Sequence, residues 1–415
     1  MFISTINNIL SVLGVVLALY GLYYVVVSLF GLKRPKAYAP CAPRSRFAVL
    51  VAARNEEAVI GNLVDSLLAQ NYPRELYDIY VLPNNCTDNT RRAAIRAGAK
   101  VLDCTVPVRS KGQVLSFAFD CLLKDGNYDA FCVFDADNLV HPDFLSSMNN
   151  ALCSGVRLAQ GYRDSKNPAD SAIATCYSIY FWMIDRFYNQ GRANLGLSCA
   201  LNGCGFMVHA DVIRSMGGYH THTLTEDSEF TLQCVLCGVR AAWVPGAVFF
   251  DEQPLTFRES WKQRKRWTSG LFECTPRYLG ALIRRFLTQR DMTCLDLAIY
   301  LLSPVFQVLC CLSLLFSGAL NLLYLNYRVF PAAVVGLNMF LSLDFSYLVA
   351  VFSALSVLVV ERKYRASYLS GVAMYWLFVM SWIPLTIYCL ISPTRSWDEI
   401  RHTRGISLKE LKSIR

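Results

Sequence analysis

Charged residues are scarce in this chain of 415 residues, at 17%, while apolar residues make up 54%. Soluble domains average about 25% charged residues, so part of the chain is expected to lie in lipid. The sequence also lacks the pattern GxxxxGK[ST], which argues against a P-loop nucleotidase. Its 16 cysteines have no regular spacing, so a disulfide scaffold is not expected and the thiols are predicted to be reduced.

Basic residues exceed acidic ones by 40 to 31, which gives a net charge of +9. An excess of this size is compatible with three partners: anionic lipid, nucleic acid or a phosphorylated substrate. The 13% aromatic content excludes a disordered chain. The position of the basic residues along the chain must therefore distinguish the partners.

Two regions have the length and apolarity of membrane segments. The first, from Ile6 to Phe30, has no charge and is followed at once by Lys33 and Arg34, so a transmembrane helix with its C-terminal end in the cytoplasm is predicted. The second starts near Thr293. Because basic residues in both 361–365 and the tail favour the cytoplasm, one loop is outside or one segment is re-entrant; we favour a cytoplasmic tail.

Between these regions the chain reads as one soluble α/β domain. The apolar run Arg46–Arg54 precedes a helical pattern, Tyr77–Leu82 repeats the arrangement, and Ala130–Phe134 forms a third strand. Such βα units form parallel sheets that bind ligands at the carboxyl ends of their strands. The predicted segments are a transmembrane helix (1–31), the α/β domain (32–250), amphipathic interface helices (251–292), three or four transmembrane helices (293–392) and a cytosolic tail (393–415).

Three motifs could carry chemistry. Asp135-Ala136-Asp137 follows a buried strand, where its carboxylates could hold a divalent cation, although turn-capping aspartates are the simpler interpretation of this motif alone. Thr225-Glu226-Asp227 opens a predicted helix, where acidic residues are common for dipole reasons. Gln263–Trp267 lies in a basic and aromatic stretch that suits a helix on the inner membrane face, so binding of nucleic acid is not expected.

The order and spacing of these motifs resemble the membrane-embedded processive glycosyltransferases of family 2, which include cellulose, chitin, hyaluronan and poly-N-acetylglucosamine synthases. The resemblance covers residues 45–292 and rests on Asp135–Asp137, Thr225–Asp227 and the QRxRW motif Gln263–Trp267, flanked by membrane segments. It implies a GT-A, Rossmann-like nucleotide-sugar-binding domain in the cytosol, inserted between transmembrane helices of a multi-pass plasma-membrane protein. It also implies a UDP-sugar donor and Mg²⁺ or Mn²⁺.

The resemblance implies a role for individual residues. Relatives often carry Asp where this chain has Asn84, whose carbonyl oxygen can still accept a hydrogen bond from uracil. The implied assignments are catalysis by Asp227, as the general base, and Glu226; nucleotide binding by Ala53, Asn55, Glu56, Asn84, Asp88, Lys111 and Asp135; metal binding by Asp137; diphosphate binding by Gln263, Arg264 and Arg266; and acceptor binding by Trp267, Asn202, Gly203, Cys204 and Gly205.

The leading hypothesis is an inverting hexosyltransferase that elongates a β-linked polysaccharide and secretes it through a channel of its own helices. The alternative is a non-processive enzyme that adds one sugar to a membrane lipid carrier. Because so few membrane segments would form only a narrow channel, a homo-oligomer or export partners remain alternatives. Intact Asp137 and Asp227 argue against a third reading, an inactive scaffold or transporter.

Overall fold

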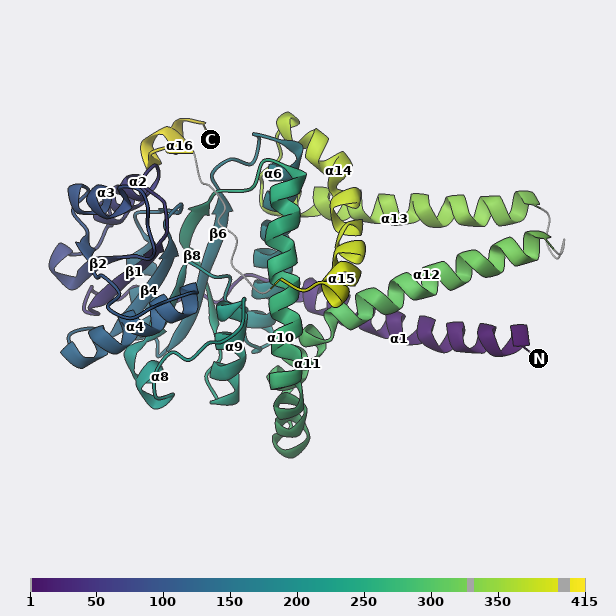
Figure 1. Ribbon diagram of the computed structural model, residues 1–415, viewed down its shortest axis with the longest axis horizontal. Helices are drawn as coiled ribbons and strands as arrows, with labels where there is room; N and C mark the ends of the chain where they lie inside the picture. Colours follow the sequence, from purple (N-terminus) through teal and green to yellow (C-terminus); the bar gives the residue numbers. More distant parts are fainter. Residues whose placement is uncertain (1, 327–331, 395–403, 415) are drawn as a thin grey trace.

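The computed structural model describes residues 2–326, 332–394 and 404–414. Figure 1 shows a twisted sheet covered by helices at one end of the molecule and three long helices, α1 (Phe2–Phe30), α12 (Ser303–Asn326) and α13 (Ala332–Val360), projecting together from the other end. Between the two parts stands α10 (Phe257–Gln289), which runs across the direction of α1. The molecule therefore consists of a globular part and a helical part that meet along α10.

The globular part is built on one mixed sheet of eight strands in the order β3-β2-β1-β4-β7-β6-β8-β5. The four strands from β3 to β4 are parallel, as the βα pattern predicts, whereas β7 runs antiparallel to both of its neighbours. The strands are β1 (Phe47–Ala53), β2 (Tyr77–Pro83), β3 (Lys100–Val101), β4 (Ala130–Asp135), β5 (Leu139–Val140), β6 (Leu158–Ser165), β7 (Phe206–His209) and β8 (Ala242–Asp251).

Helices cover both faces of this sheet because its central strands are apolar on both sides. Along β1, Val49 and Val51 pack with α2, α3 and α5, while Ala48 and Leu50 pack with α4, α8 and α9. These helices are α2 (Ile60–Leu68), α3 (Thr90–Arg96), α4 (Lys111–Asp125), α5 (Phe144–Cys153), α6 (Ala172–Met183), α7 (Gln190–Asn194), α8 (Ala210–Ser215) and α9 (Glu226–Leu236), with the short turns η1 (Arg74–Leu76) and the π-helical η2 (Ile184–Asn189).

Helix α10 begins with a capping box in which Thr256 and Glu259 bond each other's backbone. It then packs against α9, α11 (Met292–Leu301) and α15 (Trp382–Ile391). Close contact with the TED motif is possible because residue 270 is glycine: a Cβ atom there would lie 2.9 Å from the backbone nitrogen of Thr225. The QRxRW helix is thereby held directly against the start of α9.

By length and composition, three described segments could cross a membrane: Asn8–Phe30, Ser303–Leu320 and Ala366–Ile391. The third does not run with the other two. It divides at Ser381 into α14 (Leu369–Met380) and α15, preceded by the turn η3 (Ala366–Tyr368), and Figure 1 shows both helices lying beside α10 instead of projecting with α1. The broken segment thus lies across the bundle formed by α1, α12 and α13.

The loop after α13 and the C-terminal segment both contact the globular part. Glu361 accepts a hydrogen bond from the Tyr162 hydroxyl at 2.8 Å, and Lys363 pairs with Asp164 at 2.6 Å. Leu411 of α16 (Leu408–Ile414) packs with residues of β5 and β8. The basic loop 361–365 and the C-terminal segment, which the positive-inside rule puts in the cytoplasm, therefore both lie on the side of the sheet. Helices α14 and α15 lie between them in the chain. The tail motif Trp397–Thr403 lies outside the described residues.

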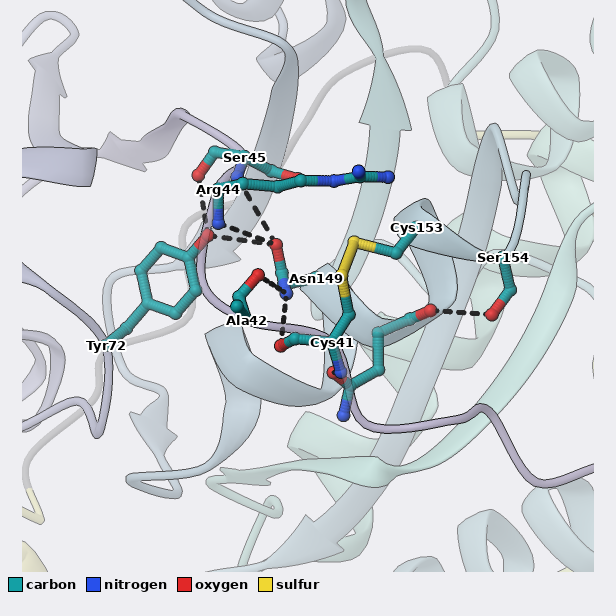
Figure 2. Close-up of a disulfide and its surroundings, with 9 residues drawn as sticks. Cys41, Ala42, Arg44, Ser45, Tyr72, Asn149, Cys153 and Ser154 are labelled. Atoms are coloured by element: carbon teal, nitrogen blue, oxygen red, sulfur yellow. Dashed lines mark hydrogen bonds between the residues drawn. A yellow bond between two sulfur atoms is a disulfide. The ribbon is translucent and has the colours of Figure 1, made fainter.

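Cys41 and Cys153 are joined by a disulfide, which corrects the prediction that all thiols are reduced. Figure 2 shows how the segment after α1 is fastened to α5 at this point. Besides the disulfide, the side chain of Asn149 bonds the backbone of Cys41, Ala42 and Ser45. This pairing could not be predicted from the sequence, because Cys41 and Cys153 are 112 residues apart and only the fold brings them together.

Candidate active site

A cavity of about 1060 Å³ begins at the carboxyl ends of β1, β2 and β4, passes α9 and α10, and ends among α1, α12, α13 and α14. Ala53, Glu56 and Asn84 line its first end, and Tyr24, Gln307 and Ser346 line its last. One continuous space thus connects the loops of the sheet with the helices that could enter a membrane. Its volume is at the upper end of the usual range for small-molecule sites.

The acidic DxD motif lies at the end of β4, where this cavity begins. Its first carboxylate, of Asp135, is held at 2.5 Å by the ammonium of Lys111. Burial alone would raise the pKa of Asp135, but Lys111, Arg163 and Arg266 outweigh burial and lower it. Asp137 is almost fully buried and accepts a hydrogen bond from the backbone nitrogen of Glu252 at 3.3 Å.

Lys111 connects the two halves of the site. Its ammonium donates to the carbonyl of Gly203 at 2.7 Å and lies 3.6 Å from the carboxylate of Glu226, in addition to its contact with Asp135. Burial alone would lower the pKa of Lys111, but the two carboxylates raise it, so the lysine is charged. It lies at the first residue of α4, where Ser110 caps the helix. Lys111 therefore holds the DxD loop, the 203 loop and the TED motif together.

Asp227 has the properties of a general base. Burial first and the charge of Glu226 second raise the pKa of its carboxyl group to about 7, against the lowering effects of the Ser228 backbone, Lys111 and Arg266. A base works best when its pKa is near the operating pH. Gly203 leaves the approach to this carboxylate open, since a Cβ atom at that position would lie 3.5 Å from Asp227 Oδ2.

Three residues of the QRxRW motif face the cavity, and helix geometry explains which. Gln263, Arg266 and Trp267 are three and four residues apart and share one face of α10, and all line the cavity. The indole of Trp267 stacks on Trp382 at 6.4 Å and meets Phe181 edge-on at 6.0 Å, which fixes its plane. It is half-buried and offers an aromatic surface to the cavity that Asp227 also lines.

The buried polar atoms of the cavity wall that have no hydrogen-bond partner within the described part of the chain include Asn84 Oδ1, Asn202 Nδ2, Gln263 Oε1 and Tyr188 Oη. Buried polar atoms are nearly always paired, so each of these atoms needs an explanation. They are distributed along the cavity from the end at the sheet to the end among the long helices. A bound substrate that spans the cavity would satisfy them.

The donor set suits a hard divalent cation of the Mg²⁺ type only in one binding mode. No group of three or more His, Cys, Asp or Glu residues that could hold a metal ion occurs in 2–326, 332–394 or 404–414. Magnesium, however, is commonly held by one or two carboxylates together with substrate phosphates and water. Asp137, with Asp135 beside it, fits that mode.

A family model described as "Glycosyltransferase like family 2" matches residues 43–270, more than half of the chain. The chain belongs to this family. The probable glycosyltransferase YdaM of Bacillus subtilis is 24% identical over 368 residues, covering 86% of this glycosyltransferase and 83% of YdaM. A beta-monoglucosyldiacylglycerol synthase of Synechocystis is 28% identical over 251 residues, covering 58% of this chain and 50% of that protein. The match thus spans only half the length of that synthase.

Among solved structures, the mannosyltransferase PcManGT from Pyrobaculum calidifontis, in complex with GDP-Man and Mn²⁺, has a TM-score of 0.60. The two chains are 18% identical, and the likeness covers 92% of this glycosyltransferase and 99% of PcManGT. At this identity the likeness shows the fold: a GT-A-like Rossmann domain with a mixed sheet. The predicted fold of the globular domain is therefore confirmed.

Several predicted site residues of the glycosyltransferase lie outside the cavity. Arg264 faces away from Gln263 and donates to Ser381 Oγ at 2.7 Å and to the Phe378 carbonyl at 3.2 Å, so it supports the break between α14 and α15 instead of a diphosphate. Lys111, which was assigned to nucleotide binding, does line the cavity, and its ammonium contacts the carboxylates of Asp135 and Glu226.

Two residues that were predicted to bind the nucleotide, Asn55 and Asp88, hold the loops after β1 and β2 in shape and do not line the cavity. Asn55 Oδ1 accepts a hydrogen bond from the Thr87 backbone at 2.8 Å, and Asp88 accepts one from the Glu57 backbone at 3.1 Å. In the predicted acceptor loop, Asn202 and Gly203 line the cavity, whereas Cys204 is fully buried and Gly205 packs on the Phe249 ring. The remaining predicted residues, Ala53, Glu56, Asn84, Asp135, Asp137, Glu226, Asp227, Gln263, Arg266 and Trp267, line the cavity.

Sequence reasoning missed a charged pair beside the DxD motif. Arg163 at the end of β6 donates through Nε to Asp251 at the end of β8 at 3.1 Å, and through a second nitrogen to the carbonyl of Asn202 at 3.2 Å. Burial, ahead of the opposing effect of Arg163, raises the pKa of Asp251 to about 6. The rule that ligands gather at strand ends could have found Asp251, because the apolar run Ala247–Phe250 precedes it.

Proposed function

We propose that this protein transfers a hexose from a UDP-sugar to the hydroxyl group of a membrane lipid, with inversion and with the help of a divalent metal ion. The observation that carries the proposal is the continuous cavity from the strand ends to the membrane-type helices, with Asp227 between the two ends. A soluble donor can enter from the sheet side. A lipid acceptor can enter from the helical side without leaving the bilayer.

The non-processive activity is better supported than elongation of a polysaccharide. The relatives include beta-monoglucosyldiacylglycerol synthases, and the product named there is a glucosylated lipid. The chemistry of the site agrees, because a lipid hydroxyl must lose a proton as it attacks and Asp227 is placed to accept one. A lipid phosphate, by contrast, is already an anion and would meet the carboxylates of Asp227 and Glu226.

In the proposed reaction, the acceptor oxygen attacks the anomeric carbon of the donor while its proton passes to Asp227. The bond from the anomeric carbon to the diphosphate oxygen breaks on the opposite face, so an α-linked donor gives a β-linked product and UDP leaves. In this proposal Arg266, which lines the cavity, binds the diphosphate and supplies positive charge there. A metal ion held at Asp137 would neutralise the charge that develops on the diphosphate.

On the nucleotide side, the buried and unpartnered oxygen of Asn84 suits a hydrogen bond from the uracil ring. Trp267 offers its face to a sugar ring near the reacting carbon. Gln263, on the same face of α10, presents its unpartnered amide oxygen to the cavity. Lys111 is proposed as a positioning residue, because it holds Asp135 and Glu226 in place.

For the membrane topology, we propose that α1, α12 and α13 cross the bilayer and that α14 and α15 lie at its surface with α10. This arrangement puts two crossings after the catalytic domain. It places the basic loop 361–365 and the C-terminal segment on the same side as the sheet, as the positive-inside rule requires. The catalytic domain then faces the cytoplasm.

The test is sugar transfer by purified full-length protein in vesicles containing diacylglycerol. With Mg²⁺ or Mn²⁺ and a panel of UDP-sugars and GDP-mannose, one UDP-sugar is expected to give a lipid carrying one sugar, resolved by thin-layer chromatography. Asp227→Asn should still bind the donor but lose about 100-fold or more in turnover. A product that grows into a polymer, or a rate untouched by chelator, would contradict the proposal.

A further inference from the structure

The membrane end of the cavity has two sides, and they differ in how their polar groups are satisfied. One side is formed by α1, η2, α11 and α12, and the other by α13 and α14. On the α13 side, Trp376 donates to Ser346 at 3.0 Å, Tyr375 contacts Met183 Sδ at 3.1 Å, and Ser353 donates to the Val349 carbonyl at 2.8 Å. These polar groups are satisfied within the protein.

On the α1 side, the hydroxyl of Tyr188 is buried, lines the cavity and has no partner among the residues that the structure describes. We propose that the acceptor lipid occupies this side, with its polar backbone at Tyr188 and its acyl chains between α1 and α12. The inference rests on the proposed function and deepens it, because it names the entry side and the headgroup-binding residue.

Tyr188 is held rigidly in position. It lies on η2, a π-helical turn, a feature that often occurs at functional sites. The guanidinium of Arg192 lies 3.3 Å from the centre of its ring, and the ring of Tyr300 meets it edge-on at 6.1 Å. Since the ring is clamped from two directions, its hydroxyl is preorganised to bond a ligand without further ordering.

Tyr188 is connected to the proposed reacting centre through Tyr300. Tyr300, its neighbour, lies within interaction distance of Ser228 and Asp227. Tyr300 thus contacts Tyr188 on one side and interacts with the proposed base on the other. A lipid with a short polar backbone, such as a glycerol with two esters and one hydroxyl, could place an ester oxygen at Tyr188 and its hydroxyl at Asp227.

The charges on this side favour a neutral lipid. Arg192, which lines this side of the cavity, is paired through two hydrogen bonds of 2.9 Å with Asp296, and both side chains are 1% exposed. Arg192 therefore needs no negatively charged group from the lipid. The carboxylates of Asp227 and Glu226 would, in addition, repel a lipid phosphate. Diacylglycerol fits this wall better than a polyprenyl phosphate.

The helices on the α1 side offer a path to the bilayer. Tyr24 and Ser28 of α1 are one turn apart and line the cavity, as do Ser303 and Gln307 of α12. The opposite face of α1 carries exposed apolar residues, among them Leu22 and Leu29. Acyl chains that leave between α1 and α12 would thus pass directly into lipid.

The experiment uses the full-length protein in phosphatidylcholine vesicles with diacylglycerol and the best UDP-sugar. Tyr188→Phe keeps the ring on Arg192 but removes the hydroxyl, so the KM for diacylglycerol should rise about tenfold. The KM for the donor, and the slow release of UDP without acceptor, should stay within about twofold. Tyr80→Phe, at a tyrosine outside the cavity, is the matched control.

A second pair of variants tests the entry side independently of the hydroxyl. Ser28→Phe blocks the α1 side and Ser353→Phe blocks the α13 side, and both residues line the cavity. Ser28→Phe is expected to lower lipid glycosylation about tenfold more than Ser353→Phe. The reverse order, or a Tyr188→Phe protein with wild-type KM for diacylglycerol, would overturn the inference while leaving the proposed function intact.

The control for the proposed function is the wild-type protein. If it releases UDP but forms no lipid product with diacylglycerol, the proposed function fails and the inference fails with it. Replacing diacylglycerol with polyprenyl phosphate should give no product. A higher rate with polyprenyl phosphate would keep lipid transfer but overturn the assignment to a neutral acceptor.

Discussion

The carboxyl group of Asp227 is expected to control the pH dependence of transfer. Burial and the neighbouring Glu226 raise its pKa to about 7, and a base can accept a proton only in its ionised form. Turnover with both substrates saturating should therefore fall about tenfold per pH unit below pH 7 and level off above it. A rate profile between about pH 5 and 9 measures this effect.

Glu226→Gln provides the control for that profile. Removing the adjacent negative charge should lower the pKa of Asp227 and shift the acidic limb to lower pH, while Lys111 keeps its contact with Asp135. A wild-type profile that is flat between about pH 5 and 7 would exclude Asp227 as the group that limits the rate.

Single residues differed in how well the sequence predicted them. Asp135, Asp137, Asp227, Arg266 and Trp267 lie in motifs, and all of them line the cavity. Residues of the same motif can nevertheless point in different directions, and the 100° step along α10 turns Arg264 away from Gln263. Tyr188 lies in no recognised motif. Its position depends on packing against Arg192 and Tyr300, and these contacts are apparent only in the folded chain.

At the scale of elements, the contact between α10 and α9 should govern activity. In Gly270→Ala the new methyl group would meet Thr225, whose nitrogen lies 2.9 Å from the Cβ position, and force α10 away from the TED motif. Turnover is expected to fall about 10–100-fold because Trp267 and Arg266 move relative to Asp227. Steady-state kinetics on the purified protein would measure the loss.

Gly280→Ala in the same helix is the matched control. Gly280 is exposed, and a Cβ atom there would meet no described atom within 4 Å. Alanine should stabilise the helix by about 0.5–1 kcal/mol and leave turnover unchanged. Equal losses from both variants would show that α10 tolerates no alanine and that contact with Thr225 is not the cause.

Elements were predicted well where local pattern decides them. The strands β1, β2 and β4 begin and end within about two residues of the apolar runs that predicted them, and the helix α9 begins at the TED motif as predicted. The antiparallel β7 was not anticipated, since its four residues carry no directional signal. The orientation of α14 and α15 could not be predicted either, because hydropathy gives the length of an apolar segment but not the direction in which it lies.

At the scale of the whole molecule, a buried ion pair links the helix α1 to the catalytic domain. Asp296 of α11 binds Arg192 of α7 and also accepts a hydrogen bond from Tyr23 of α1. Asp296→Asn would leave the charge of Arg192 buried without a counter-charge, so the protein should lose about 3–5 kcal/mol of stability. Chemical unfolding in detergent micelles measures the loss.

Asp211→Asn is the control for that substitution, because Asp211 pairs with Arg214 at the surface, with 65% and 45% of their side chains exposed. Its effect should stay below about 0.5 kcal/mol. The double variant Arg192→Met/Asp296→Leu should recover much of the loss, since neither charge is left buried. A small effect of Asp296→Asn would show that Arg192 reaches water.

The position of Asp227 between the sheet and the three projecting helices also determines which concentration of the acceptor controls the rate. Under the proposed function, the lipid moves only within the plane of the bilayer, so the enzyme responds to the mole fraction of acceptor in the surface. Diluting diacylglycerol with inert lipid would slow the enzyme even when the amount per millilitre is unchanged. The donor arrives from water, so the rate depends on its bulk concentration. The two substrates of one cavity are thus governed by different concentrations, one in three dimensions and the other in the two dimensions of the membrane.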